Sequence, residues 1–370
     1  MLRIAINVVN VVYEMRYRKT HVIDLPKRIV VGSGVRKEIS KHFKSLGLES
    51  PITIVTGSGP TQSIGREVRE HLEDSRFDVF QLEVRLANID SVSKVEEVAR
   101  ESRCKVIVGL GGGKAIDVAK YVAYRMDVDF ISVPTSASHD GLVSPFASLK
   151  GMNTIYSMKA KAPLMVLADT ELIAKAPRRF LIAGCGDLIG KFTAVLDWQL
   201  AHKLRGEYYG QYAASLALLS AKHIISLSNI IAKGGEEAAR IVVEGLISSG
   251  VAMCIAGSTR PASGSEHLFS HALDLVANFP ALHGEQVGVG TIMMAYLHGR
   301  NWSMIRRVLK KLGAPTTARE LGVSNEKVIE ALTIAHKIRP ERYTILGEKG
   351  LTRKAAEKLA KTTGVIEEEL

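Results

Sequence analysis

The sequence predicts an α/β fold in which a Rossmann-like, mostly parallel sheet domain is followed by an all-helical C-terminal domain. Up to about residue 177, short apolar runs rich in β-branched residues alternate with helical patterns, as in strands joined by crossover helices. From residue 179 onward, the apolar spacing is helical nearly everywhere. The chain has 370 residues, which exceeds the size at which one hydrophobic core usually stops growing.

Six short apolar runs are expected to form the sheet. Residues 52–56 are continuously apolar or β-branched, as in a parallel strand buried on both faces. The predicted strands cover residues 28–31, 52–56, 77–82, 105–110, 129–133 and 164–167. The predicted helices cover residues 35–46, a stretch after Thr61, a helix capped by Asp90 and Ser91 that runs to about residue 102, and residues 114–125. Because strands and helices alternate, we expect helices on both faces of the sheet.

Glycines and prolines divide the helical half into several segments. They stand at Gly206, Gly234, Gly235, Gly257, Pro280, Gly313 and Pro340. Because glycine and proline interrupt helices, this spacing favours several antiparallel helices. We place the boundary near residue 177, so that residues 1–177 form a dinucleotide-binding domain and residues 178–370 a helical metal- and substrate-binding domain. The active site is expected in the cleft between them.

The first residues are expected to be an extension of the fold. Residues 1–13 are mostly apolar, although Asn7 and Asn10 interrupt them. The stretch is shorter than the roughly 20 residues of a transmembrane helix, and no small-residue cleavage site follows it. We interpret residues 1–15 as a short added strand or tail, or as residues upstream of a start at Met15. No other segment is long and apolar enough to span a bilayer, so we expect no membrane insertion.

The composition is that of a soluble globular enzyme, with 46% hydrophobic and 24% charged residues. Cys104, Cys185 and Cys254 are too few and too widely spaced for a disulfide framework, which favours a reducing cytoplasm. A net charge of +11 suits either nucleic acid or anionic substrates and dinucleotides. Because the basic residues are spread along the chain without a basic block, we expect no nucleic-acid binding.

A glycine-rich turn joins a predicted strand to a predicted helix. Residues 109–114 read Gly-Leu-Gly-Gly-Gly-Lys. Glycines let the backbone approach a diphosphate closely, and the following helix N-terminus favours anions. The turn departs from the G-x-G-x-x-G pattern because the last glycine is missing. We interpret it as a dinucleotide site; a glycine loop without a ligand is the alternative.

A second polar loop follows the next predicted strand. Residues 134–141 read Pro-Thr-Ser-Ala-Ser-His-Asp-Gly. They place hydroxyls, an imidazole and a carboxylate at the carboxyl end of a strand, which is the usual ligand side of such sheets. A solvated turn is the other interpretation.

Three helix starts in the second half carry side chains suited to a metal. Asp187 stands in an otherwise apolar run, and His283 follows the break at Pro280. His267 and His271 are four residues apart and therefore share one helix face. One carboxylate and two imidazoles suit an open zinc site, whereas capping or a chance histidine pair would explain them without a metal. The absence of H-E-x-x-H disfavours a metalloprotease.

Five motifs together resemble a known family. Gly-Gly-Gly-Lys-Ala-Ile-Asp, Pro-Thr-Ser-Ala-Ser-His-Asp-Gly, Gly-Asp-Leu-Ile-Gly-Lys, Glu-His-Leu-Phe-Ser-His and His-Gly-Glu-Gln-Val occur in this order. They are similar to those of the archaeal sn-glycerol-1-phosphate dehydrogenases, relatives of glycerol dehydrogenase, the iron-containing alcohol dehydrogenases and dehydroquinate synthase. The resemblance covers nearly the whole chain from about Met15, and the second and fourth motifs are the most specific.

The resemblance implies an activity and a set of residues. It implies NAD(P)H-dependent, reversible reduction of dihydroxyacetone phosphate to sn-glycerol 1-phosphate, the backbone of archaeal ether lipids, by a cytoplasmic homo-oligomer. One zinc ion per subunit would be held by Asp187, His267 and His283. Asp140, Asp187 and His271 would contact substrate, and His271 and Asp187 would be catalytic. NAD(H) or NADP(H) would be lined by Gly113, Lys114, Ala115, Ile116, Asp117, Thr135, Ser136, Ala137, Ser138 and Ser144. Glycerol dehydrogenase activity on unphosphorylated substrate is the alternative.

Three points stay open at the level of sequence. The basic residues that bind the substrate phosphate are not determined by spacing, and the candidates are Lys159, Lys161, Lys191 and Arg260. His271 is the preferred proton donor, with His139 or a hydroxyl relay from the cofactor as alternatives. Residues 56–60 supply no carboxylate after the second strand, so we predict that both NAD and NADP are used.

Overall fold

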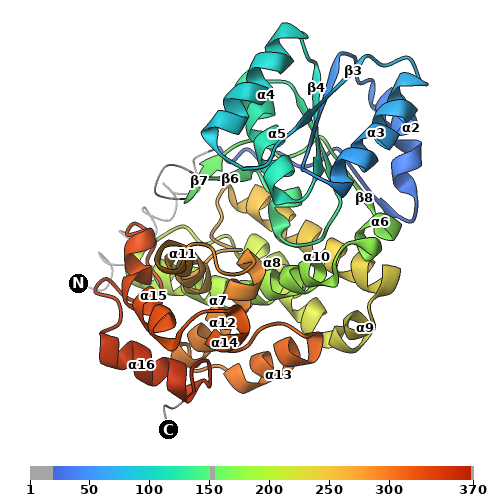
Figure 1. The fold of residues 1–370 in the computed structure, drawn as a ribbon. Coiled ribbons are helices and arrows are strands. Elements are labelled where there is room, and N and C mark those ends of the chain that lie inside the picture. Colours follow the sequence, from blue (N-terminus) through green and yellow to red (C-terminus); the bar gives the residue numbers. More distant parts are fainter. Residues whose placement is uncertain (1–19, 151–154, 368–370) are drawn as a thin grey trace.

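The computed structural model describes residues 20–150 and 155–367; the expected extension over residues 1–15 lies outside them. The first half contains one six-stranded sheet (Figure 1) with the order β1–β8–β5–β4–β2–β3. All neighbouring strands in it are parallel, which confirms the predicted sheet. The strands are β1 (Arg28–Gly32), β2 (Ile52–Thr56), β3 (Val79–Glu83), β4 (Val106–Gly111), β5 (Asp129–Pro134) and β8 (Met165–Asp169).

Helices cover both faces of the sheet because its side chains alternate between two apolar surfaces. Ile52 and Ile54 pack in one cluster with side chains of α2 and α3. Val55 points the other way and packs in a second cluster with α4 and α5. The elements are η1 (Val35–Glu38), α2 (Ile39–Leu46), α3 (Pro60–Glu73), α4 (Ile89–Glu101) and α5 (Gly113–Met126).

Three local features differ from the sequence prediction. The N-cap of α4 is Asn88, whose side chain accepts a hydrogen bond from the backbone N–H of Ser91; neither Asp90 nor Ser91 is the cap. A hairpin of β6 (Phe146–Lys150) and β7 (Ile155–Lys159) forms a separate antiparallel sheet that was not predicted. A short helix, α6 (Thr170–Lys175), follows β8.

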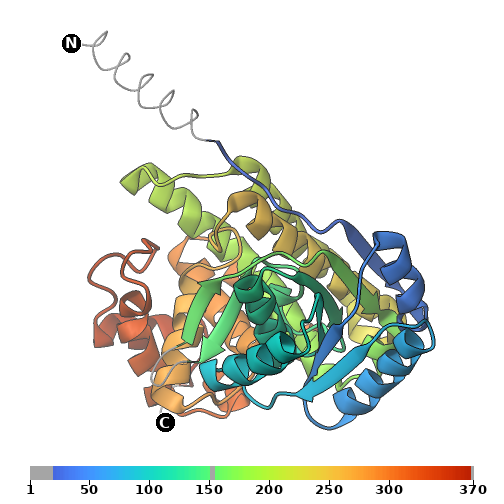
Figure 2. The ribbon, with the colours of Figure 1, turned by 90° about the horizontal axis from the view of Figure 1, so that it is seen from above.

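The second half contains no strand among described residues 178–367. Its first helix begins at Arg178, directly after the expected boundary. Gly206 and Gly257 adopt left-handed conformations that end α7 and α10. The helices are α7 (Arg178–Arg205), α8 (Gln211–Ser226), α9 (Ser228–Lys233), α10 (Gly235–Ala256), α11 (Ser265–Ala277), α12 (His283–Leu297), α13 (Trp302–Leu312), α14 (Ala318–Leu321), α15 (Asn325–Ile338) and α16 (Arg353–Thr362). Figure 2 shows α15 and α16 (red) on the opposite side of the molecule from α2 and α3 (blue).

One apolar cluster extends through both halves of the molecule. It includes Ile107 and Ile116 from the sheet half, and Leu188, Val242 and Met293 from the helical half. The helix α10 lies within this core. Contrary to the prediction that no other segment is long and apolar enough to span a bilayer, α10 meets both criteria, alone among the described residues. However, 67% of its apolar window is buried inside the protein. Its apolar character is therefore explained by core packing.

Candidate active site

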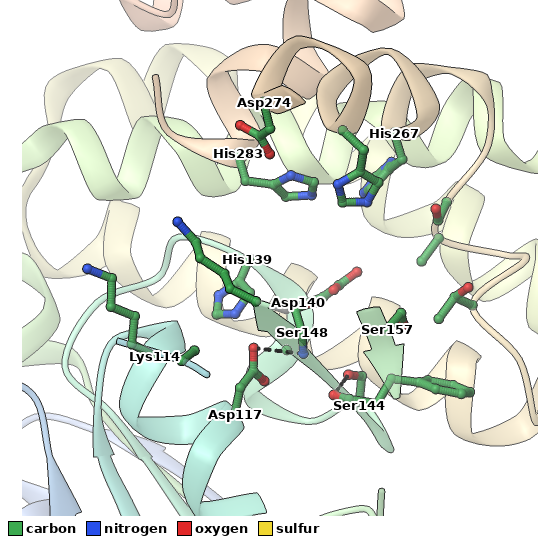
Figure 3. A pocket seen from close by; sticks show the side chains of 18 of the residues that line it. Lys114, Asp117, His139, Asp140, Ser144, Ser148, Ser157, His267, Asp274 and His283 are labelled. Atoms are coloured by element: carbon green, nitrogen blue, oxygen red, sulfur yellow. Dashed lines mark hydrogen bonds between the residues drawn. The ribbon is translucent and has the colours of Figure 1, made fainter. Parts of the chain in front are cut away.

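A cleft of about 350 Å³ lies between the sheet half and the helical half. Figure 3 shows side chains of α5 and the following loops on one side of it, and side chains of α11 and α12 on the other. Both predicted ligand loops of the first half reach it. The residues of the predicted site that line the cleft are Lys114, Asp117, Asp140, Ser144, His267, His271 and His283.

Three predicted metal ligands meet at the base of this cleft. Asp187, His267 and His283 each offer one donor atom, and these atoms lie within 4.8 Å of one another. The Nε2 of His267 is 3.3 Å from Oδ1 of Asp187. Asp187 is 1% exposed, so the carboxylate is held inside the protein.

Two glycines bring these ligands together. A Cβ atom at Gly186 would lie 2.1 Å from the carbonyl oxygen of Gly284, and one at Gly284 would lie 1.8 Å from that of Ala183. The helices α7 and α12 therefore approach so closely that no side chain fits between them. Because Asp187 follows Gly186 and His283 precedes Gly284 in the chain, this crossing places the carboxylate beside the imidazole.

Hydrogen bonds fix the orientation of both imidazoles. Nδ1 of His267 lies 2.8 Å from Oε1 of the buried Glu266. Ser270 donates its single hydroxyl proton to Gln286, so its oxygen, 3.1 Å from Nδ1 of His283, accepts from that nitrogen. With Nδ1 protonated in each ring, Nε2 carries the free lone pair, as metal-binding histidines require. Glu266, Ser270 and Gln286 lie within the sequence motifs, but no role was assigned to them.

A buried lysine joins the two predicted substrate carboxylates. Nζ of Lys191 is 2.8 Å from Asp187 Oδ1 and 2.8 Å from Asp140 Oδ2. Burial alone would raise the pKa of Asp187, but the positive charge of Lys191, with smaller contributions from His267 and His283, outweighs it and holds the pKa well below its usual range. For Lys191, burial is outweighed by the charges of Asp140 and Asp187, which raise its pKa. The Asp187 carboxylate therefore stays ionised.

Comparisons with known proteins identify the relatives of this chain. A model of the iron-containing alcohol dehydrogenase family matches residues 30–177. The chain is 58% identical to the glycerol-1-phosphate dehydrogenase (NAD(P)+) of Aeropyrum pernix, over 95% of this chain and 100% of that protein. It is 55% identical to the enzyme of that name from Sulfurisphaera tokodaii, over 94% and 99% of the two chains. The chain belongs to the glycerol-1-phosphate dehydrogenases.

Solved structures of more distant proteins share the fold. The glycerol dehydrogenase of Schizosaccharomyces pombe matches with a TM-score of 0.75 at 21% identity, over 93% of this chain and 90% of that one. A probable glycerol dehydrogenase from Sinorhizobium meliloti 1021 gives a TM-score of 0.74 at 20% identity, over 93% and 98% of the two chains. At this identity the likeness concerns architecture alone.

In this member of the glycerol-1-phosphate dehydrogenases, His271 of α11 lines the cleft. Its side chain makes no hydrogen bond to described residues of α7 or α12, the helices that carry Asp187 and His283. Its ring stacks on that of His283 at 5.5 Å between centroids, and its Nδ1 is buried without a partner among the described residues. Burial, followed by the charges of His283, His267, Arg339 and Arg342, lowers the pKa of His271 well below its usual range. The imidazole is therefore neutral near pH 7.

The glycine turn has the backbone that the sequence predicts. Gly111 ends β4 with φ +152°, and Gly113 begins α5. The predicted cofactor residues divide into two groups. Lys114, Asp117 and Ser144 line the cleft, whereas the side chains of Ala115, Ile116 and Ala137 belong to the core. Gly113, Thr135, Ser136 and Ser138 flank the same loops without lining the cleft.

Asp117 also has a structural partner that the sequence did not indicate. Its Oδ2 accepts a hydrogen bond from the backbone of Ser148 in β6 (Figure 3). Its Oδ1 is 3.3 Å from the fully buried Nζ of Lys120. That lysine also donates to the carbonyls of Gly141 and Phe146. Lys120 and Asp117 thereby attach the unpredicted hairpin to the start of α5.

The phosphate-binding candidates from the sequence do not line the cleft. Lys191 is occupied by two carboxylates and the carbonyl of Ala262. Arg260 pairs with Glu207, and Lys161 donates to the carbonyl of Val128. The basic residues that do line the cleft are Lys114, Lys150 and Arg339. Arg339 and Lys150 were missed because neither stands in a recognisable motif.

Proposed function

We propose that this chain reduces dihydroxyacetone phosphate to sn-glycerol 1-phosphate with NADH or NADPH, in a reversible reaction. The observation that carries the proposal is the convergence of Asp187, His267 and His283 at the base of a cleft whose other side is the glycine turn. The names of relatives at 53–58% identity support the same substrate. The product would supply the glycerophosphate backbone of membrane lipids.

We infer that Asp187, His267 and His283 hold one zinc ion per subunit. Two imidazole nitrogens and one carboxylate oxygen are a donor set that zinc prefers, with a position left for substrate. The hydrogen bonds from Nδ1 of both histidines support this, because they leave Nε2 free for a metal. When bound, zinc supplies Lewis-acid polarisation of the substrate C2 oxygen and the nicotinamide supplies reducing equivalents.

The protein's own side chains would position the substrate beside these groups. Lys191 holds Asp140 and Asp187 in fixed relation, and Ser249 donates to Asp140 at 2.7 Å. His271 would contact the substrate and remains our candidate to deliver the proton. Because its buried Nδ1 has no acceptor among the described residues, we assign its proton to Nε2, since an unpaired buried N–H is costly.

The test is NADH oxidation with dihydroxyacetone phosphate before and after chelation, with chiral analysis of the product. We expect activity that chelation abolishes, that zinc restores, and that yields sn-glycerol 1-phosphate. Equal or faster reaction with unphosphorylated dihydroxyacetone or glycerol would favour a glycerol dehydrogenase instead. We also infer a cytoplasmic homo-oligomer, which light scattering on the purified protein would test.

A further inference from the structure

Three arginines gather at the helical side of the cleft. Arg339 lines the cleft at the end of α15. Arg342 follows it, and Arg260 stands between α10 and α11. Burial, together with the charges of Arg339 and Arg260, lowers the pKa of Arg342 to about 9. Arg342 therefore lies close enough to both other guanidinium groups to be repelled by them.

Acidic partners account for only part of this positive charge. Glu207 forms a two-pronged ion pair with Arg260, including a 2.6 Å contact to Nε. Even so, Nη1 of Arg260 is buried and has no partner among the described residues. Burial lowers the pKa of Arg339, and the charge of Glu341 offsets this only in part. Neither carboxylate makes an ion pair with Arg339 or Arg342 among the described residues.

Arg342 is hydrogen-bonded to two residues that line the cleft. It donates to the carbonyl of Ser263 and to the hydroxyl of Thr259, each at 2.6 Å. Both of those residues line the cleft. Arg339 differs from Arg260 and Arg342 because its side chain has no hydrogen bond or ion pair to any described residue. A partly buried guanidinium without a partner is costly, so its position points to a ligand.

The other cleft cations have different neighbours. Lys114 stands at the start of α5 beside the glycine turn, where the dinucleotide phosphates are expected. Nζ of Lys150 lies 3.3 Å from the ring centroid of Phe279. Arg339 instead lines the cleft together with His271, the predicted substrate contact, and with Thr259 and Ser263, which accept hydrogen bonds from Arg342. An anionic group held by the arginines would thus belong to the substrate and not to the cofactor.

We propose that Arg339, supported by Arg342 and the Thr259 hydroxyl, binds the phosphate group of the three-carbon substrate. A phosphate monoester carries about 1.5 to 2 negative charges at pH 7, and the planar guanidinium binds two of its oxygens through parallel N–H groups. The assignment rests on the proposed function. It makes Arg339 the residue that distinguishes a phosphorylated ketone from its unphosphorylated analogue.

The test uses Arg339→Met, because Arg339 holds no other described residue in place. We expect its KM for dihydroxyacetone phosphate to rise by roughly 30-fold or more, as when one partner of a charged hydrogen-bonded pair is removed. Zinc content and the affinity for NADH should not change. Arg339→Lys, which keeps the charge but loses the two-pronged geometry, should give an intermediate KM. The matched control is Arg307→Met, an exposed arginine of α13, whose KM should equal that of the wild type.

Inorganic phosphate provides a second readout that a general loss of structure would not imitate. It should inhibit the wild type competitively with dihydroxyacetone phosphate and should inhibit Arg339→Met far less. Reaction with unphosphorylated dihydroxyacetone should be equally slow in both proteins. An unchanged KM and unchanged phosphate inhibition in Arg339→Met would overturn the assignment while the proposed function stands. A wild type that does not oxidise NADH with dihydroxyacetone phosphate would instead reject the proposed function.

Discussion

Asp274 is a buried carboxyl group at the edge of the cleft. Burial raises its pKa to about 6, although Gln286 donates a hydrogen bond to it and Lys150 lies nearby. The folded protein therefore binds this proton more tightly than the unfolded chain does. Between pH 3.8 and about 6, the free energy of unfolding should fall as the pH rises, by up to about 3 kcal/mol, and it should stay lowered above that range.

Asp274→Asn should remove this loss, because an amide keeps the oxygen that accepts from Gln286 but carries no charge. We expect the variant to be more stable than the wild type at pH 7.5 and about equally stable at pH 4. Chemical denaturation at both pH values measures the difference. Asp74→Asn, on the exposed end of α3, is the control and should change neither value. Equal stability of Asp274→Asn and wild type at pH 7.5 would contradict the prediction.

The histidines of the site should separate into ligands and a non-ligand. His271→Ala should lower kcat by about 100-fold or more, the usual contribution of a positioned proton donor, while zinc stays near one per subunit. His267→Ala and His283→Ala should each lose zinc and activity together. Metal analysis of the purified variants decides this. Loss of stoichiometric zinc in His271→Ala would show that His271 is itself a ligand.

At the scale of secondary structure, the crossing of α7 and α12 should control the metal site. Gly186→Ala would place a methyl group 2.1 Å from the carbonyl oxygen of Gly284, so the two helices must move apart. We expect a loss of stability of about 1–3 kcal/mol or more, with zinc below one per subunit. Gly245→Ala is the control, since its methyl group meets only the ends of the Leu188 and Ile224 side chains and no backbone atom. Normal zinc binding in Gly186→Ala would show that the crossing is not required.

The strands and helices of the sheet half could be predicted because their apolar patterns are strong and continuous. The hairpin of β6 and β7 could not, since two strands of only five residues each leave little periodicity. Asp187, His267 and His283 were found through motifs, and the structure brings them together. Arg339 and Lys120 were missed because a charged residue gives no sequence sign of being buried or turned inward.

At the scale of the whole molecule, we expect the cofactor specificity to depend on the carboxyl ends of β2 and β3. Thr56 ends β2 beside Glu83, the last residue of β3. The Glu83 carboxylate is held by Gln62 and Arg85. No free carboxylate follows β2 to repel a 2′-phosphate, so kcat/KM for NADH and NADPH should agree within about tenfold, or 1.4 kcal/mol.

Steady-state kinetics with both cofactors tests this prediction. Glu83→Gln is the informative variant, because it removes the one carboxylate beside Thr56 in the register of the sheet. If Glu83 contributes to discrimination, the variant should shift toward NADPH, and otherwise the ratio should not move. A preference for NADH of more than about 100-fold in the wild type, or 2.7 kcal/mol, would refute the prediction.

The apolar cluster that runs from the sheet into the helical half has a consequence for motion. Two bodies joined by a thin linker can swing about a hinge, but here Ile107 and Met293 belong to one packed interior. Separating the two halves would expose this apolar surface to water, which is energetically unfavourable. We therefore expect substrate entry and product release to depend on rearranged loops and side chains at the cleft mouth. For the same reason, neither half should persist as a monomeric, soluble fragment when it is expressed without the other.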